Sequence, residues 1–328
     1  MTNFNYQQLN LALSYIAAAG QILHQPTPER IHDEIETSLQ NSQATKGEFD
    51  IVWGPAMYRY QHSLVDDNLM MVVKSKNNDS DYRVVVRATN TCSLFDWIVE
   101  DLWVNKTVPW SKYDPLAPAQ ARISKGTDVG MSVLLNLYVS KGLAGAGTDL
   151  LTYLQEIIAT SKKRIDLTVV GHSLGGALSA SLGLYLASKL NDSISLSIQA
   201  SAGPTAGNCA FAEYSHQKLG NRLLRLHNSL DIVPHAWSAN SLEQLHQLYY
   251  PTASFPKELE NSFKLALAAA RINGYTQLLP EQILSGVIND ELTNYAEQAR
   301  YQHVDAYAIL LGMTMKDFEI SNYKLVPK

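Results

Sequence analysis

The sequence predicts an α/β protein in which a central, mostly parallel sheet is flanked by helices. Short β-branched runs alternate with helical periods along most of the chain, a pattern typical of a sheet covered on both faces. One β-branched run, at 166–170, passes directly into a glycine-rich pentapeptide that opens a helix of small residues. The segment 240–300 is helix-rich and shows no strong strand pattern. We therefore expect one domain over residues 1–328, with 240–300 as a helical insertion or cap rather than more sheet.

The expected elements follow from the spacing of apolar residues. An amphipathic helix is predicted over about 6–23. Buried strands at 70–73 and 82–86 flank a turn signal at 77–80. The remaining predicted elements are helices at 129–139, 149–162 and 175–190, and strands at 166–170, 193–200 and 223–226.

Composition excludes several classes of protein. The chain has 31 acidic and 26 basic residues, a net charge of −5, and no basic stripe, which argues against binding to nucleic acid. Its two cysteines, Cys92 and Cys209, have no neighbours at metal-ligand spacing, so no metal is expected. The apolar stretch 11–23 is too short to span a bilayer, and no positively charged leader precedes it. We therefore expect no transmembrane segment, and a protein that is cytoplasmic or exported without a conventional signal peptide.

The pentapeptide Gly171-His172-Ser173-Leu174-Gly175 is the strongest chemical signal in the chain. A strand before it and a helix after it form the strand–turn–helix arrangement of a nucleophile elbow. Such a turn exposes the serine hydroxyl and points the first helical N–H groups toward charge developing on a substrate oxygen. The two glycines fit the close approach of strand and helix. The competing interpretation is a glycine-rich turn with an incidental serine, and the two flanking elements weigh against it.

A serine hydroxyl is a weak nucleophile, so it needs a base that is held by a third group. In enzymes with a nucleophile elbow, the chain order is serine, acid, histidine. The candidates for the base are therefore the histidines that follow Ser173, namely His216, His227, His235, His246 and His303.

Four blocks, in order along the chain, resemble the class 3 lipases, a family of fungal-type triacylglycerol lipases with an α/β-hydrolase fold. Residues 84–89 are similar to the family's strand ending in Arg-Gly-Thr/Ser, and residues 95–102 to its lid segment. Residues 168–176 match the elbow, and residues 228–235 resemble the block that supplies the catalytic aspartate. The resemblance covers about residues 70–310, and it implies an α/β-hydrolase fold with a lid helix.

The resemblance also implies which residues complete the site. It assigns the acid to Asp231, whose competing interpretation is a turn-forming aspartate after a strand. It assigns the base to His303, which an aromatic helix follows. His235 is the main rival, only four residues beyond Asp231, and His246 is a second. We favour His303, because the loop around His235 belongs to the acid.

Two backbone N–H groups are expected to form an oxyanion hole. One belongs to Leu174, the residue after the nucleophile. The resemblance assigns the other to Thr89. The sequence departs from the family at Ala88, where glycine is usual, so the oxyanion loop is the point at which the resemblance is weakest.

Residues of about 90–106 are expected to form the lid. Four apolar residues there fall at i, i+3, i+4 and i+7, on one face of a helix. The competing interpretation is a fixed amphipathic helix packed on the core. The residues assigned to the lid are Phe95, Trp97, Ile98, Val99 and Leu102, of which all but Trp97 lie on that face.

Together these observations predict a serine ester hydrolase, a lipase or carboxylesterase that works through an acyl-enzyme on Ser173. One alternative is a phospholipase A1, and another is a non-catalytic signalling or scaffold protein on a lipase fold. We expect a lipid or hydrophobic ester as substrate, transient contact with a lipid interface, and no cofactor. The sequence leaves the oligomeric state open.

Overall fold

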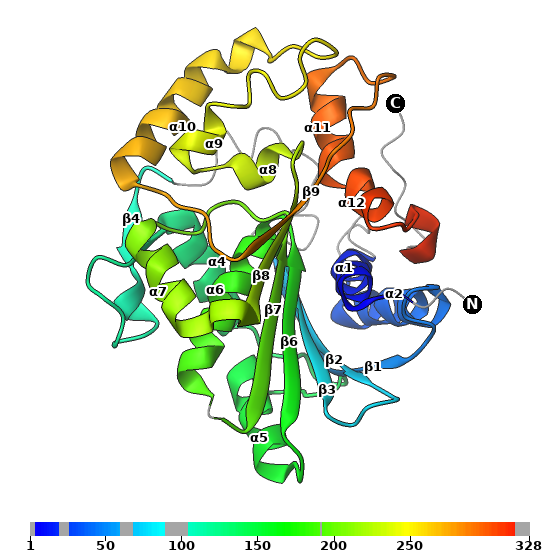
Figure 1. Cartoon of the computed structure of the whole chain (residues 1–328). Coiled ribbons are helices and arrows are strands. Elements are labelled where there is room, and N and C mark those ends of the chain that lie inside the picture. Colours follow the sequence, from blue (N-terminus) through cyan, green and yellow to red (C-terminus); the bar gives the residue numbers. More distant parts are fainter. Residues whose placement is uncertain (1–3, 20–25, 60–67, 89–103, 191, 319–328) are drawn as a thin grey trace.

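A seven-stranded sheet runs through the middle of the molecule in the order β1-β2-β3-β6-β7-β8-β9 (Figure 1). This computed structural model describes residues 4–19, 26–59, 68–88, 104–190 and 192–318. The first two pairs of neighbouring strands are antiparallel, and the other four pairs are parallel. The strands are β1 (Phe49–Tyr58), β2 (Asn68–Ser75), β3 (Asp81–Ala88), β6 (Ile165–His172), β7 (Ile194–Ser201), β8 (Leu223–Asn228) and β9 (Glu281–Leu284).

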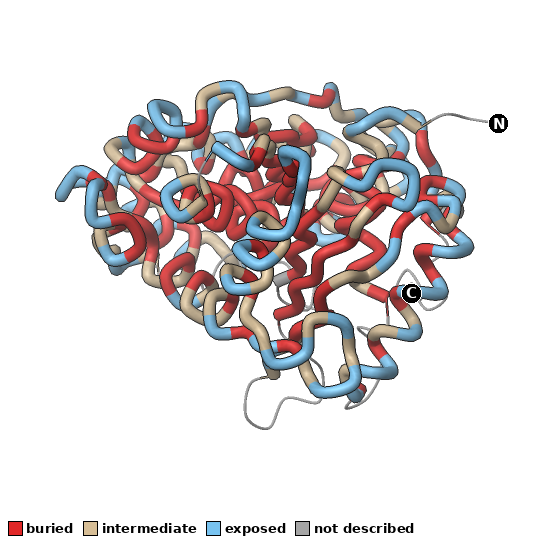
Figure 2. Tube along the Cα trace, turned by 90° about the horizontal axis from the view of Figure 1, so that it is seen from below, coloured by how far each residue is buried: buried red, intermediate tan, exposed pale blue. Residues whose placement is uncertain are grey.

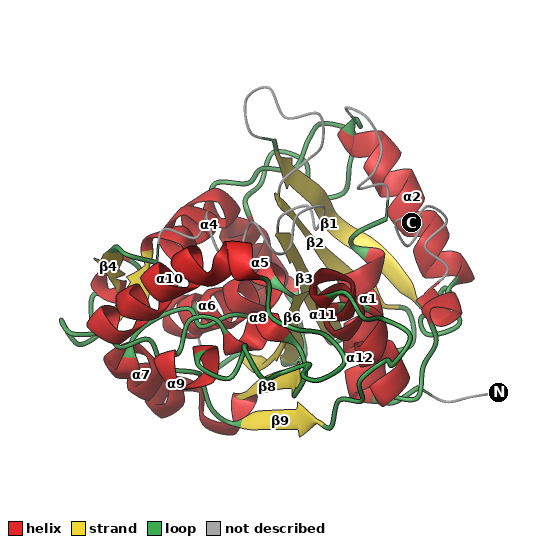
Figure 3. Cartoon of the chain, turned by 90° about the horizontal axis from the view of Figure 1, so that it is seen from above, coloured by secondary structure: helices red, strands yellow, loops and turns green. Residues whose placement is uncertain are grey.

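Helices cover both faces of the sheet, as the sequence predicts for strands with continuous apolar runs (Figures 1 and 3). One face packs against α1 and α2, and a buried apolar layer that includes Leu13, Ile35 and Val85 fills the space between them. The larger core lies on the other face, where buried residues follow the strands and the inner sides of the helices (Figure 2). The helices are α1 (Tyr6–Ile16) and α2 (Pro28–Asn41) on the first face, and α4 (Lys125–Leu135), α5 (Leu150–Thr160), α6 (Leu174–Lys189) and α7 (Cys209–Leu219) on the second.

A helical layer lies above the carboxyl ends of the parallel strands (Figure 1). This layer has an apolar core of its own, which contains Trp237, Tyr249, Phe263 and Tyr295. In open α/β sheets the carboxyl edge is where ligands bind. The layer consists of α8 (Ile232–His235), α9 (Ala239–Leu242), α10 (Glu260–Asn273) and α11 (Tyr295–His303), with α12 (Asp305–Leu310) following α11.

Smaller elements connect these layers. A two-stranded sheet of β4 (Thr107–Pro109) and β5 (Arg122–Ser124) leads into α4. Short 3₁₀ turns lie at Trp110–Lys112, Gly220–Arg222, Lys257–Leu259 and Met315–Phe318. Within the described part of the chain, no helix combines the length and apolar character that crossing a bilayer requires.

One expectation about the fold is wrong: the segment 240–300 does add a strand to the sheet. β9 pairs in parallel with β8, with Arg225 opposite Glu281 and Asn228 opposite Leu284. It is a four-residue edge strand in which only Leu284 is buried. A strand this short and this exposed carries no apolar alternation, so its pairing depends on β8 and not on its own sequence.

Candidate active site

Ser173 occupies the turn between β6 and α6, with φ 63° and ψ −132°. This backbone conformation is strained for any residue other than glycine and persists only where the surroundings hold it. The N–H of Ser173 donates to Ser201 O at the end of β7 (3.0 Å), and its carbonyl accepts from the N–H of Gly176 (2.8 Å). Neighbouring strand and helix thus fix the turn from both sides.

The elbow requires an unusually close approach of β6 and α6. A Cβ atom at Gly171 would collide with the backbone of Gly175, and one at Gly176 would collide with the carbonyl of Ser201. Leu174 is the first residue of α6, so its N–H lies in the first turn and has no acceptor within the helix. It can therefore donate to another acceptor at the carboxyl edge of the sheet, where Ser173 lies.

Ser173, His303 and Asp231 form one continuous hydrogen-bonded chain. His303 Nε2 lies 2.8 Å from Ser173 Oγ, and His303 Nδ1 lies 2.8 Å from Asp231 Oδ2. His303 and Asp231 have no exposed surface, and Ser173 is 7% exposed. The hydroxyl of Ser173 is therefore hydrogen-bonded to a ring nitrogen that can accept its proton. The carboxylate of Asp231 holds that ring in position from the other side.

The carboxylate of Asp231 is satisfied by three donors. Asp231 caps the N-terminus of α8, where Oδ1 accepts from the N–H of Val233 (3.0 Å). Oδ2 accepts from His303 Nδ1 and also from the hydroxyl of Tyr307 (2.8 Å). Burial raises the pKa of Tyr307 well above its ordinary value of 10, so the phenol stays a neutral donor. Its oxygen in turn accepts from the N–H of Asn228, the last residue of β8 (3.0 Å).

The rival histidines lie elsewhere. His235 Nδ1 donates to the backbone carbonyl of Asp231 (2.7 Å) and not to its carboxylate. His246 Nε2 bonds Glu260 Oε1 (3.0 Å), and its ring packs between Phe255 and Phe263 in the helical layer. The structure thus brings His303, and neither of the two rivals, against Ser173 Oγ.

Several predicted site residues lie outside the described part of the chain. They are the oxyanion residue Thr89 and the lid residues Phe95, Trp97, Ile98, Val99 and Leu102. Ala88 is the last residue of β3, where it pairs with Asn68 of β2. Of the two cysteines, Cys92 is also outside the described part, and Cys209 is a free, exposed thiol at the start of α7.

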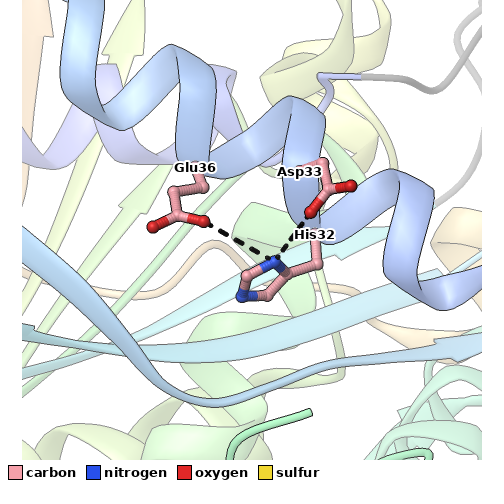
Figure 4. Close-up of side chains that lie close together, drawn as sticks. All are labelled: His32, Asp33 and Glu36. Atoms are coloured by element: carbon pink, nitrogen blue, oxygen red, sulfur yellow. Dashed lines mark hydrogen bonds and ion pairs between the residues drawn. The ribbon is translucent and has the colours of Figure 1, made fainter. Parts of the chain in front are cut away.

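One cluster of potential metal ligands occurs among the described residues, and the sequence analysis did not identify it. His32, Asp33 and Glu36 lie together on α2, with His32 Nδ1 3.5 Å from the carboxylate of Asp33 and 3.9 Å from that of Glu36 (Figure 4). Both carboxylates are exposed, and none of the three residues belongs to the Ser173–His303–Asp231 chain. The i, i+4 spacing of His32 and Glu36 was its only sequence signal.

Sequence reasoning also gave no role to Tyr307, although it lies four residues after His303 in the block that resembles the family. The available signal was an aromatic residue at fixed spacing from the base. Its hydroxyl donates to Asp231, which lies 76 residues earlier in the sequence. No local sequence pattern predicts a contact between residues so far apart along the chain.

The fold is the α/β-hydrolase fold, a mostly parallel sheet with its serine turn at the carboxyl edge. The sequence model of the class 3 lipases matches residues 83–241. The crystal structure of M37 lipase is 32% identical, with a TM-score of 0.88, and the alignment covers 96% of each chain. The chain therefore belongs to the class 3 lipase family.

More distant structures share the fold. Lip2 lipase from Yarrowia lipolytica is 13% identical, with a TM-score of 0.56 over 94% of this chain and 92% of its own. A triacylglycerol lipase from Penicillium expansum is 16% identical, with a TM-score of 0.54 over 98% and 100%.

A curated relative, a secreted mono- and diacylglycerol lipase of Malassezia globosa, is 26% identical over 170 residues. The match spans about half of each protein, 52% of this chain and 51% of the relative. The localisation predicted from the sequence, cytoplasmic or exported without a conventional signal peptide, is contradicted by this relative, which is named as a secreted protein. Composition and the first residues of a chain are weak guides to its compartment.

Proposed function

We propose that this chain hydrolyses hydrophobic carboxylic esters, acylglycerols above all, through an acyl-enzyme on Ser173. The observation that carries the proposal is the hydrogen-bonded chain from Ser173 Oγ through His303 to Asp231, with both links at 2.8 Å. Membership of the class 3 lipases supports the reaction, and the mono- and diacylglycerol activity named for the curated relative supports the substrate class.

In this mechanism His303 Nε2 takes the proton of Ser173 as Oγ attacks the ester carbonyl. Asp231 keeps the proton on Nδ1 and stabilises the imidazolium that forms. The imidazolium then protonates the leaving alkoxide, and a water activated by the same nitrogen hydrolyses the acyl-enzyme. The N–H of Leu174, with that of Thr89 as the proposed second donor, stabilises the tetrahedral oxyanion, an effect on the order of 3–4 kcal/mol per donor.

The test is hydrolysis of p-nitrophenyl butyrate by the wild type and four variants. Ser173→Ala and His303→Gln should each lower kcat by at least about 10³-fold, because nucleophile and base act as a unit. His235→Asn, which keeps a donor where Nδ1 lies, and His246→Gln are the matched controls and should retain most of the activity. Equal rates for the wild type and Ser173→Ala would remove the proposed enzyme activity. Loss in His235→Asn with retention in His303→Gln would reverse the assignment of the base.

Substrate class is tested separately with emulsions of monoacylglycerol, diacylglycerol, triacylglycerol and phosphatidylcholine. We expect the acylglycerols to be hydrolysed faster than the phospholipid. The comparisons favour neither a phospholipase A1 nor a non-catalytic scaffold. If the sn-1 ester of phosphatidylcholine were hydrolysed faster than the acylglycerols, the proposed substrate class would be wrong and phospholipase A1 activity would take its place.

A further inference from the structure

The helix that carries the proposed base ends at that residue. α11 stops at His303, so the last carbonyls of the helix have no N–H partner further along it. Buried carbonyls of this kind need another donor. Two of these carbonyls, and that of the next residue, are each bound by a side chain. Asn228 Nδ2 donates to Gln302 O (2.9 Å), His172 Nε2 to His303 O (2.8 Å), and Tyr15 Oη to the carbonyl of Val304, which separates α11 from α12 (2.7 Å).

The three donors come from three different elements. Asn228 ends β8, three residues before the acid Asp231. His172 ends β6 and directly precedes the nucleophile Ser173. Tyr15 belongs to α1, on the face of the sheet that the N-terminal helices cover. The backbone of residues 302–304 is thus tied to the strand before the nucleophile, to the strand before the acid, and to an N-terminal helix.

The chemistry of His172 suits a fixed neutral donor. Because a carbonyl can only accept, Nε2 carries the proton, and Nδ1 is buried with no hydrogen-bond partner among the described residues. Burial, together with the neighbouring His303, lowers the pKa of His172 well below 6.5. The rings of Tyr15 and Tyr307 meet it edge-on at 4.9 and 5.1 Å between centroids. The ring of His303 lies 4.9 Å away, so a charge on His172 would oppose the imidazolium that forms on His303 during the reaction.

We propose that Tyr15, His172 and Asn228 form a backbone clamp that positions His303 against Ser173. The inference rests on the proposed function, in which His303 is the base. It makes α1 part of the support of the active site, although the match to the family model begins at residue 83. The three residues are positioning residues, because each acts on the base through the backbone of residues 302–304.

A clamp of this kind predicts a specific kinetic effect. The Nε2–Oγ distance is set by where the backbone of His303 lies, and a displacement of about 1 Å can lower a rate by about 10²-fold. The proposed role gives none of the three donors a contact with the substrate. Loss of the clamp should therefore lower kcat and leave KM almost unchanged.

The experiment compares Tyr15→Phe, His172→Phe and His172→Gln with the wild type. Phenylalanine leaves an aromatic ring at each position and removes the donor, although at position 172 a phenyl ring replaces the smaller imidazole. Glutamine carries an amide donor close to the position of Nε2. Tyr295→Phe is the matched control, because the hydroxyl of Tyr295 also donates to a backbone carbonyl, that of Leu245 (2.9 Å), at the opposite end of α11. Each preparation is first titrated with a serine-reactive phosphonate, so that kcat refers to competent sites only.

We expect kcat to fall about 3–10-fold in Tyr15→Phe and about 10–100-fold in His172→Phe, with KM within about twofold of the wild type. His172→Gln should recover at least part of the loss, and Tyr295→Phe should match the wild type. Unchanged kcat in Tyr15→Phe and His172→Phe would overturn the clamp. An equal loss of kcat in Tyr295→Phe would also overturn it. So would a loss of total activity that is explained entirely by fewer titrated sites. A wild type that the phosphonate does not label would instead refute the proposed function, which keeps the two failures distinct.

Discussion

At the scale of single residues, the central fact is a carboxylate with no access to solvent. Asp231 is fully buried, and the donors on its two oxygens are His303, Tyr307 and the N–H of Val233. A buried charged acceptor that loses a donor retains the cost of desolvation without the compensating hydrogen bond. The Tyr307 hydroxyl should therefore matter to catalysis even though it does not touch Ser173.

We predict that Tyr307→Phe lowers kcat/KM by about 10–100-fold, since a hydrogen bond to a charged group contributes about 1.5–3 kcal/mol. Steady-state hydrolysis of p-nitrophenyl butyrate by the variant and the wild type measures the loss.

The matched control is Tyr249→Phe, whose hydroxyl donates to the carbonyl of Leu230 and not to the carboxylate (2.8 Å). It removes a neutral hydrogen bond from the same region and should retain most of the wild-type kcat/KM. An equal loss of kcat/KM in both variants would show that catalysis does not depend specifically on the hydrogen bond from Tyr307.

At the scale of elements, β6 and α6 form one structural unit that holds the strained turn of Ser173. We predict that Gly171→Ala lowers the free energy of unfolding by about 3–5 kcal/mol, because the new Cβ meets backbone that cannot move aside. Activity should fall with it, since relief of the collision would separate strand from helix at the nucleophile. Urea unfolding and titration of active sites measure the two effects.

Gly183→Ala, in the middle of α6, is the control for this prediction. Its Cβ would meet the Ile198 side chain, at Cδ1 and Cγ1, and not backbone, so a side chain and not the main chain has to move. Alanine also favours the helix by about 1 kcal/mol. We expect a smaller loss of stability than in Gly171→Ala, and normal activity, because the backbone of the elbow is untouched. Equal destabilisation by the two substitutions would contradict the account of the elbow.

At the scale of the whole molecule, buried histidines link folding to pH. Burial lowers the pKa values of His172, His227 and His235, and that of His227 falls to about 3 from an ordinary 6.5. The nearby guanidinium of Arg225 contributes further to the shift of His227. Below pH 6.5 the unfolded chain therefore binds protons that the folded chain excludes.

The sign of the linkage follows from this difference. The stability that neutral His227 provides is present above pH 6.5 and is lost as the pH falls toward about 3. We predict that the wild type loses about 2 kcal/mol of unfolding free energy through this residue between pH 6.5 and pH 5. His227→Gln, which does not titrate, should reduce that slope in urea unfolding at the two pH values. If the unfolding free energy of His227→Gln falls with pH as steeply as that of the wild type, other groups cause the acid sensitivity.

Within the whole molecule, the buried central strands could be predicted from sequence patterns, and the elements at the edges of the sheet could not. The strands at the centre of the sheet, β6 and β7, are buried on both faces and appear as apolar runs, so their positions were predicted to within a few residues. No prediction was made for α2 and β1, and β9 was excluded outright. β9 shows the reason, because it has one buried side chain and becomes a strand only where β8 offers an edge.

The sequence by itself determined the α/β class, the strand–turn–helix at Ser173 and, through the resemblance, the family. These three conclusions depend on the spacing of apolar residues, on β-branched runs and on particular residue types at fixed spacing, all of which are local properties of a chain. Only the tertiary structure decided that His303, 130 residues from Ser173, and not His235, meets its hydroxyl. It also decided that Tyr15, Asn228 and Tyr307 surround that histidine and Asp231. The physical reason is that hydrogen bonds between distant segments depend on how helices and strands pack, and no local pattern records that packing.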